Sequence, residues 1–240
     1  MSREVEIATN QRYAIVAKTG AGKTRFAMVL ASLLVPQGNK EGWETWWIDT
    51  KGDRDDWNEL AQFGFVDQAE RKHRFLPGVT QKPEKSNRKL FRVDPHKGPI
   101  WEQAQELFNN AYNHQGVLVV VDEYTQVIKN QINPGEGLMN IFTRGRGLDV
   151  GIIGMTQEPV YVPRQLLSQA SHQFLLSVTY PRDIYYLKQM YSEYEPPIWR
   201  GDRYGFYHIA VDYDGLAAYY HHQRHWFDNY FGKNSERKVA

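Results

Sequence analysis

The sequence predicts an α/β fold with a mainly parallel central sheet and a β-hairpin extension near its C-terminal end. Short apolar runs alternate along the chain with amphipathic stretches and turn residues, which is typical of parallel strands joined by helices. The most apolar run, Val-Leu-Val-Val-Val at residues 117–121, indicates a central strand that is buried on both faces. Residues 204–220 alternate apolar and polar side chains and contain Asp214-Gly215, which predicts a hairpin.

The first part of the chain is predicted to run from strand to loop to helix to strand. Residues 13–17 are apolar and partly β-branched, and a glycine-rich turn closes them, as at the end of a strand. Residues 23–34 are predicted to be helical, and the helix should end there because Pro36 and Gly38 follow. Residues 44–49, Glu-Thr-Trp-Trp-Ile-Asp, form the next predicted strand.

The middle of the chain contains an expected surface excursion followed by the central strand. Residues 67–89 are rich in Lys, Arg, Gln and Pro, which favours a solvent-exposed segment. A strand is predicted at 89–93, where an Asp-Pro pair ends it. A helix at 100–113 then leads into the strand at 117–121.

The last part of the chain continues the alternation of helices and strands. We expect helices at 137–143, 163–170 and 181–191, and strands at 150–155 and 174–178. The chain is therefore interpreted as a single domain, residues 1–240. Its parts are a core at about 13–178, an extension at about 179–232 and a flexible tail at 233–240.

The composition excludes several kinds of site. The 240 residues include 29 Lys+Arg, 28 Asp+Glu and no Cys, so disulfides, thiolate metal sites and a cysteine nucleophile are excluded. With a formal charge of +1, any contact with nucleic acid must come from a local patch. No window approaches the roughly 18 consecutive apolar residues of a membrane-spanning helix, and no apolar signal region follows the charged N-terminal residues. We therefore expect a cytoplasmic protein without a membrane span of its own.

A phosphate-binding loop is predicted between the first strand and the first helix. Residues 17–24, Ala-Lys-Thr-Gly-Ala-Gly-Lys-Thr, fit the Walker A pattern GxxxxGK[ST], except that Ala17 replaces the first glycine. Gly20 and Gly22 let the backbone curl so that its N–H groups point at phosphates, and the N-terminal end of the following helix adds positive charge. The methyl group of Ala17 requires a negative φ at that position.

The residues of this loop have individual predicted roles. Lys23 would contact the β- and γ-phosphates, and the hydroxyl of Thr24 would ligate Mg²⁺. The predicted nucleotide-binding residues are Thr19, Gly20, Ala21, Gly22, Lys23 and Thr24. ATP and Mg²⁺ are thus the expected cofactors.

Two acidic residues after the central strand are predicted to complete a site for ATP hydrolysis. Asp122 and Glu123 directly follow residues 117–121, and a carboxylate for the metal and a group that activates water belong at the end of such a strand. Asp122 is assigned to Mg²⁺ by way of water, and Glu123 to activation of the hydrolytic water. Alternatively, both are solvated acids at a strand end, but the phosphate loop upstream favours the catalytic interpretation.

Three further elements narrow the class of P-loop protein. Asp-Thr-Lys-Gly at 49–52 follows the second strand, Thr-Gln-Glu-Pro at 156–159 closes the strand at 150–155, and Arg146 precedes that strand. In this order the motifs resemble those of the FtsK/HerA superfamily of P-loop motors, which carry D-x-K-G and T-Q-x-P segments at these places. The resemblance spans about residues 13–178 and implies a P-loop NTPase fold of the RecA-like, three-layer kind.

The resemblance implies roles for one glutamine and one arginine. Gln157 matches the glutamine that senses the γ-phosphate, and Arg146 matches an arginine that serves the active site of the neighbouring subunit, with Arg144 as the competing candidate. An arginine on a glycine-flanked loop suits a neighbour's site better than its own. Alternatively, the two arginines bind DNA phosphate or solvent. An arginine that serves the neighbouring subunit in this way is called an arginine finger. This interpretation requires a homo-oligomeric ring, a hexamer or a pentamer.

The resemblance also implies a motor that moves double-stranded DNA. The chain is most similar to the genome-packaging ATPases of membrane-containing viruses with double-jelly-roll capsids. This likeness implies a place in the host cytoplasm and a capsid or membrane-vertex protein as a further partner. Candidate DNA-contacting segments are residues 82–89 and 129–131, although short charged runs are also typical of solvated surface. The histidine-rich segment 221–225 and the aromatic tail are predicted to serve packing or an interface.

Two other functions remain open alternatives. An ATPase of the DNA extrusion or conjugation type would use the same site together with a membrane partner. A nucleotide-dependent switch or scaffold with little hydrolysis is less favoured, because Lys23, Asp122, Glu123 and Gln157 are all present.

Overall fold

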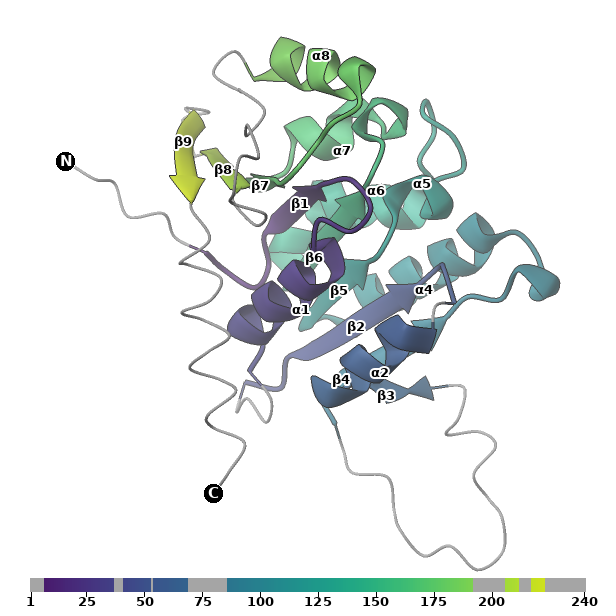
Figure 1. The fold of residues 1–240 in the computed structure, drawn as a ribbon. Helices are drawn as coiled ribbons and strands as arrows, with labels where there is room; N and C mark the ends of the chain where they lie inside the picture. Colours follow the sequence, from purple (N-terminus) through teal and green to yellow (C-terminus); the bar gives the residue numbers. More distant parts are fainter. Residues whose placement is uncertain are drawn as a thin grey trace, which may run out of the picture.

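A single nine-stranded sheet forms the centre of the molecule (Figure 1). The computed structural model describes residues 7–36, 41–52, 54–68, 86–191, 206–211 and 217–222. The strands are β1 (Arg12–Val16), β2 (Glu44–Asp49), β3 (Val66–Asp67), β4 (Arg88–Arg92), β5 (Val117–Val121), β6 (Val150–Thr156), β7 (His172–Leu175), β8 (Phe206–Val211) and β9 (Ala217–His222). The helices are α1 (Lys23–Leu34), α2 (Arg54–Gln62), α4 (Ile100–His114), α5 (Tyr124–Val127), α6 (Glu136–Arg144), α7 (Arg164–Ser168) and α8 (Pro181–Met190), and the 3-10 turns are η1 (Pro95–Lys97), η2 (Gly145–Leu148) and η3 (Pro159–Tyr161).

The strand order places the predicted functional segments at one edge of the sheet. The order is β3-β4-β2-β5-β6-β1-β7-β8-β9, and every pair from β3 to β7 is parallel. Only β8 and β9 run antiparallel to their neighbours. The carboxyl ends of β2, β5, β6, β1 and β7 therefore lie side by side, where ligands bind in open α/β sheets.

Two hydrophobic cores cover the opposite faces of this sheet. Val117, Val119 and Val121 of β5 pack with α4, α5, α6 and α7 in one cluster. Leu118 and Val120, which alternate with them, pack with α1 and α2 in the other, as the two-residue period of a strand requires. Figure 1 shows α1 and α2 on the near side of the sheet and α4 behind it. The prediction of a central strand buried on both faces is confirmed.

Most of the predicted elements are confirmed, with small shifts of their ends. The α/β fold, the mainly parallel sheet and the C-terminal hairpin are present. The strand predicted at 174–178 was misplaced, because β7 covers His172–Leu175. Its first two residues, His172 and Gln173, are polar but 3% and 1% exposed, and their polarity hid the start of the strand.

Three elements were absent from the prediction. Helix α2 contains few apolar residues, although Leu60 is 1% exposed and packs in the core on the α1 face. Strand β3 has two residues, and helix α5 has four, so neither is long enough to show a period. No helix in the described ranges is long and apolar enough to cross a membrane. Residues 69–85, the side chains of the histidine-rich segment and the tail from 223 onward lie outside the described part.

Candidate active site

The glycine-rich loop lies at the carboxyl end of β1, between two neighbouring strands. The backbone N–H of Ala17 donates to the carbonyl of Thr156 at the end of β6 (3.0 Å), and that of Lys18 donates to the carbonyl of Ser177 after β7 (2.8 Å). Gly20 and Gly22 have φ values of 74° and 83°, which a glycine adopts without steric cost. Ala17 does not occur among the described residues with positive φ, so the chain accepts alanine at the first glycine position of the pattern.

The start of α1 has the features of an anion site. Its N-cap is Gly22, no side chain caps its first N–H groups, and its first turn contains no acid. A Cβ added to Gly20 would meet nothing within 4 Å, so the space above the loop is open. Lys23 is 6% exposed, and its Nζ lies 3.5 Å from the carbonyl oxygen of Lys18. N–H groups at a helix N-terminus that no side chain caps, together with a lysine and the hydroxyl of Thr24, fit a triphosphate with Mg²⁺.

The acidic pair lies at the end of β5, and Asp122 is held by the segment that follows β2. Thr50 donates to Asp122 Oδ1 twice, from its backbone N–H (3.1 Å) and from its hydroxyl (2.6 Å). Lys51 Nζ lies 3.9 Å from Asp122 Oδ2. Asp122 is 2% exposed, so these contacts fix the carboxylate at the sheet edge.

A tight turn positions Thr50 and Lys51 for this task. Asp49 Oδ1 accepts the backbone N–H groups of Lys51 (3.0 Å) and Gly52 (3.1 Å). The indole N–H of Trp57 on α2 donates to the other oxygen of Asp49, which is 3% exposed. The sequence predicted no role for this turn beyond its match to the D-x-K-G segment of the FtsK/HerA superfamily. The adjacency of β2 and β5, both ending in polar residues, was the signal that could have found it.

Burial and a nearby acid change the ionisation of Asp122. Its pKa is raised to about 7, chiefly because burial disfavours the charged form and also because Asp49 is close, while Lys51 and the Thr50 hydrogen bonds oppose the rise. A divalent cation would favour the ionised form. Mg²⁺ in NTPase sites takes one or two carboxylates together with substrate phosphates, so Asp122 and Thr24 fit as its candidate ligands on the protein.

We expect Asp122 to make the nucleotide-free protein less stable as pH rises from about 4 to about 7. Its pKa is higher in the folded state than the ordinary 3.8, so its favourable contribution is complete below 3.8 and is lost as pH rises through about 7. Asp122→Asn cannot ionise, so its free energy of unfolding should vary less over this range. The measurement is urea denaturation at several pH values without nucleotide or Mg²⁺, and equal slopes for the two proteins would contradict the assignment.

Gln157 connects the phosphate loop to Glu123. Its side-chain Oε1 accepts a hydrogen bond from the hydroxyl of Thr19, and its backbone N–H donates to Glu123 Oε2 at 3.3 Å. The other oxygen of Glu123 accepts from the hydroxyl of Thr125 at 3.2 Å. The carboxylate of Glu123 is thus oriented at both oxygens, and the structure brings it together with the loop and with Gln157.

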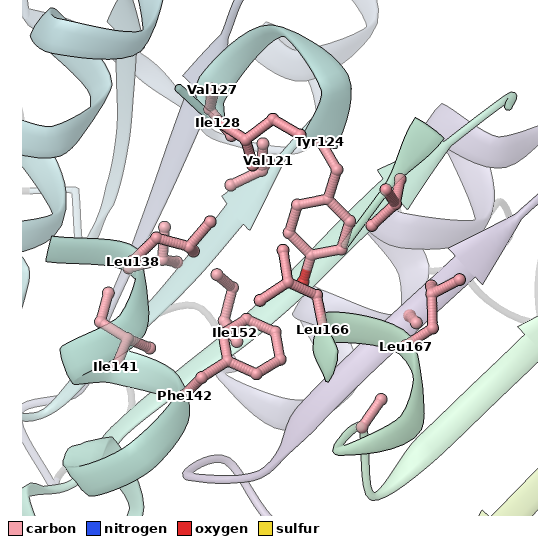
Figure 2. Packing of buried hydrophobic residues seen from close by; sticks show 14 of the residues in the cluster. Val121, Tyr124, Val127, Ile128, Leu138, Ile141, Phe142, Ile152, Leu166 and Leu167 are labelled. Atoms are coloured by element: carbon pink, nitrogen blue, oxygen red, sulfur yellow. The ribbon is translucent and has the colours of Figure 1, made fainter. Parts of the chain in front are cut away.

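Tyr124 anchors the backbone directly after Glu123. Its ring is fully buried and lies among Phe142, Ile152 and Leu166 (Figure 2). The Tyr124 ring has room here because residue 154 is glycine. A Cβ at residue 154 would lie 1.7 Å from Tyr124 Cζ. Glycine inside a strand often marks such a close approach, so Gly154 was the sequence signal for this contact.

Arg144 and Arg146 lie at the opposite edge of the sheet. Arg144 ends α6, and Arg146 is in η2, before the amino end of β6, and both side chains are exposed. Gln157 follows the carboxyl end of the same strand, and seven residues at about 3.3 Å each span roughly 20 Å. The structure therefore brings the other predicted site residues to one edge and leaves these two arginines on the far one.

Solved structures with the same fold include two viral packaging proteins and VirB4. The genome packaging NTPase B204 from Sulfolobus turreted icosahedral virus 2, in complex with ATP-gammaS, has a TM-score of 0.60 and 12% identity, with 89% of this chain and 98% of that chain covered. The DNA-packaging ATPase B204 from Sulfolobus turreted icosahedral virus has a TM-score of 0.61 and 13% identity, with coverage of 88% and 97%. VirB4 of Thermoanaerobacter pseudethanolicus has a TM-score of 0.60 and 13% identity, with 88% of each chain covered.

Sequence comparison alone does not detect these relationships. No protein-family description matches the sequence, and no curated protein matches it. The similarity therefore lies in the order and direction of the strands. The chain has the α/β fold of the P-loop ATPases, with the mostly parallel sheet that the alternation of strands and helices in the sequence predicted.

Proposed function

We propose that this protein is an ATP-driven translocase of double-stranded DNA, and specifically a viral genome-packaging motor. The observation that carries the proposal is the connection of Thr19, Gln157 and Glu123 at one edge of the sheet. If Gln157 moves when the γ-phosphate is hydrolysed, its hydrogen bonds would shift both Thr19 of the phosphate loop and Glu123, the group that activates water. The packaging role is supported by the B204 structures, whose chains are covered almost in full.

In the proposed reaction, water attacks the γ-phosphorus and the bond to the departing ADP oxygen breaks. Glu123 takes the proton from the water, and Gln157 orients it without adding a buried charge. Lys23 and the N–H groups of the loop bind the phosphate oxygens. Mg²⁺, held by Thr24 and Asp122, would neutralise charge that develops between the β- and γ-phosphates.

We also propose that the arginine finger acts between copies of the chain. Arg146 and Gln157 of the same chain lie at opposite ends of β6, which is roughly 20 Å long. The Arg146 side chain is exposed at the far edge of the sheet. An arginine in this position can reach the phosphates of an adjacent copy in a ring, where such fingers stabilise transition-state charge. The ring, a hexamer or a pentamer, is part of the proposal.

The test of the proposed function is steady-state ATP hydrolysis with and without double-stranded DNA. Turnover that increases with DNA, and is lost in Lys23→Ala, would support a translocase. Absence of turnover at concentrations where rings form would favour the nucleotide switch. Stimulation by DNA that appears only with a membrane partner would favour the extrusion or conjugation type, which is the second candidate.

The loop between α5 and α6 is a candidate DNA contact. The side-chain oxygen of Asn130 accepts the N–H groups of Ile132 (3.0 Å) and Asn133 (2.7 Å), which gives the loop a defined shape. Lys129 lies exposed at its start, with Nζ 5.3 Å from the Trp101 ring centroid. Gln131 donates to the carbonyl of Val160 in η3 at 3.0 Å. Since η3 begins two residues after Gln157, DNA at this loop and nucleotide at the site would act on the same segment.

Lys129→Ala is expected to weaken binding of double-stranded DNA without changing its sequence preference. One lost phosphate contact should reduce the slope of log K against log salt by about 1. The measurement is fluorescence anisotropy of a labelled duplex at several salt concentrations. Lys188→Ala, which removes an exposed lysine of α8, is the matched control. Equal slopes for the wild type and Lys129→Ala would remove this loop from the DNA interface. Of the other candidate segment, 82–89, residues 82–85 lie outside the described part. Arg88 and Lys89 belong to β4, where Arg88 is buried and Lys89 forms an ion pair with Glu44 at 2.6 Å.

A further inference from the structure

The segment before β1 lies against the amino edge of the sheet, beside the turn that carries Arg146. The carbonyl of Gln11 accepts the backbone N–H of Ile152 at 3.0 Å. A Cβ added to Gly151 would lie 1.9 Å from the carbonyl oxygen of Thr9. Backbone meets backbone here with no room for a side chain, so the segment 8–12 has a fixed position relative to the start of β6.

Two side chains of this segment hydrogen-bond to the region around Arg146. Asn10 Nδ2 donates to the backbone carbonyl of Arg146 at 3.2 Å and to Asp149 Oδ1 at 3.3 Å. Arg12 Nη1 donates to the carbonyl of Phe142 at 2.6 Å, near the end of α6. The segment thus holds the turn on both sides of Arg146.

The turn itself has a closed shape that these contacts can preserve. The backbone N–H of Asp149 donates to the carbonyl of Gly145, and Asp149 has a left-handed φ of 54°, which Asp tolerates better than most residues. A Cβ on Gly145 would lie 2.8 Å from the carbonyl oxygen of Val150. The backbone around Arg146 is therefore defined by local geometry, and Asn10 ties it to the sheet.

Arg12 and Arg146 interact electrostatically. Burial, followed by the positive charge of Arg146, lowers the pKa of Arg12. The two guanidinium groups are thus close enough to repel each other, and Arg12 is held by its bond to Phe142. The Arg146 side chain is exposed, so an anion outside the protein can approach it.

We infer that Asn10 is a positioning residue, which holds Arg146 in the geometry needed to reach a phosphate bound by the adjacent copy of the chain. The inference rests on the proposed role of Arg146 in trans. An arginine finger acts on the transition state, and a misplacement of about 1 Å can cost as much as 10²-fold in rate. Loss of Asn10 should therefore lower kcat and leave ATP binding by the same subunit unchanged.

The first experiment compares Asn10→Ala with Thr9→Val in ATPase assays of the full chain. Thr9 also donates to a backbone carbonyl, that of Leu34 at 3.0 Å, so the control removes a similar hydrogen bond from the same segment without touching the arginine turn. We expect kcat to fall about tenfold in Asn10→Ala, with KM unchanged, and to remain near the wild-type value in Thr9→Val. Equal kcat values for Asn10→Ala and the wild type would overturn the inference.

A second experiment separates positioning from loss of folding. Asn10→Ala subunits retain an intact acid, and Glu123→Gln subunits retain an intact finger, so mixed rings should have a higher turnover per subunit than Asn10→Ala alone. Asn10→Asp loses the donor and places a second carboxylate beside Asp149, so its kcat should fall at least as far as that of Asn10→Ala. Asp149→Asn added to it should recover part of kcat by restoring one hydrogen bond. Absence of both effects would overturn the inference.

Arg146→Ala distinguishes failure of this inference from failure of the proposed function. If Arg146→Ala keeps full turnover, the proposed finger is wrong and Asn10 has nothing to position. If Arg146→Ala is inactive while Asn10→Ala is fully active, the finger stands and the positioning role of Asn10 is wrong.

Discussion

Arg146→Ala is expected to bind ATP as the wild type does and to lose nearly all hydrolysis, with kcat reduced by about 10³-fold or more. Its own nucleotide site lies at the other edge of the sheet, so the substitution changes no group near the bound ATP. The side chain is exposed, and substitutions on the surface usually change stability by no more than about 0.5 kcal/mol. A large loss of turnover in a folded protein would then come from the absent charge.

Mixing experiments show whether the lost arginine acts in trans. Arg146→Ala has an intact Glu123, and Glu123→Gln has an intact Arg146, so some interfaces of a mixed ring contain both groups. Turnover should appear in the mixture although each protein alone is inactive. Arg144→Ala is the matched control, because Arg144 is exposed two residues earlier at the end of α6. The assignment would be reversed if Arg144→Ala is inactive alone and recovers turnover on mixing, while Arg146→Ala is active alone. No recovery with an inactive variant of either arginine would contradict a finger in trans.

The positions of most strands along the chain and the phosphate loop could be predicted because each has a local signal. The apolar run at 117–121 is long and β-branched enough to identify a buried strand. Gly20, Gly22 and Lys23 form a pattern whose mechanism depends on backbone conformation, and the strand and helix beside it can be predicted separately. The central strand and the phosphate loop are determined by residues that are close together in the sequence, and the structure confirms the positions predicted for both.

The contacts that support the site could not be predicted, because they join residues far apart in the chain. Asp122 depends on Thr50, 72 positions away, and Gln157 meets Thr19, 138 positions away. Pairing of this kind follows from strand order, and a strand order can be derived only after every strand is known. Helix α2 was missed for a related reason, since Trp57 contributes through its bond to Asp49 and not through an apolar period.

The opposite placement of Arg146 and Gln157 also has a consequence for regulation. One β6 strand carries the group that would sense a chain's own γ-phosphate at one end and the group that would serve the adjacent chain at the other. Its residues pair with β5 and β1 along their length, so the strand is a rigid connection. In the proposed ring, nucleotide state at one interface could pass through β6 to the next.

Glu123→Gln is expected to retain ATP and to lose hydrolysis, with kcat reduced about 10²- to 10⁴-fold, the contribution of a positioned general base. The glutamine carbonyl can accept the backbone N–H of Gln157, as Glu123 Oε2 does now. Its amide can donate to the hydroxyl of Thr125, which at present donates to Glu123 Oε1 and can serve in either role. The change therefore removes the base while preserving both hydrogen bonds, and the fold should remain intact.

The measurement combines ATP binding by calorimetry with single-turnover hydrolysis, which separates binding from chemistry. Asp122→Asn is the matched comparison, because it makes the same change at the adjacent position. Since Asp122 is the candidate metal ligand, its variant should lose the dependence of ATP affinity on Mg²⁺, whereas Glu123→Gln should keep it. Hydrolysis by Glu123→Gln at the wild-type rate would exclude Glu123 as the base. An equal loss of Mg²⁺ dependence in both variants would mean that the two carboxylates share the metal, and that the division of roles between them is wrong.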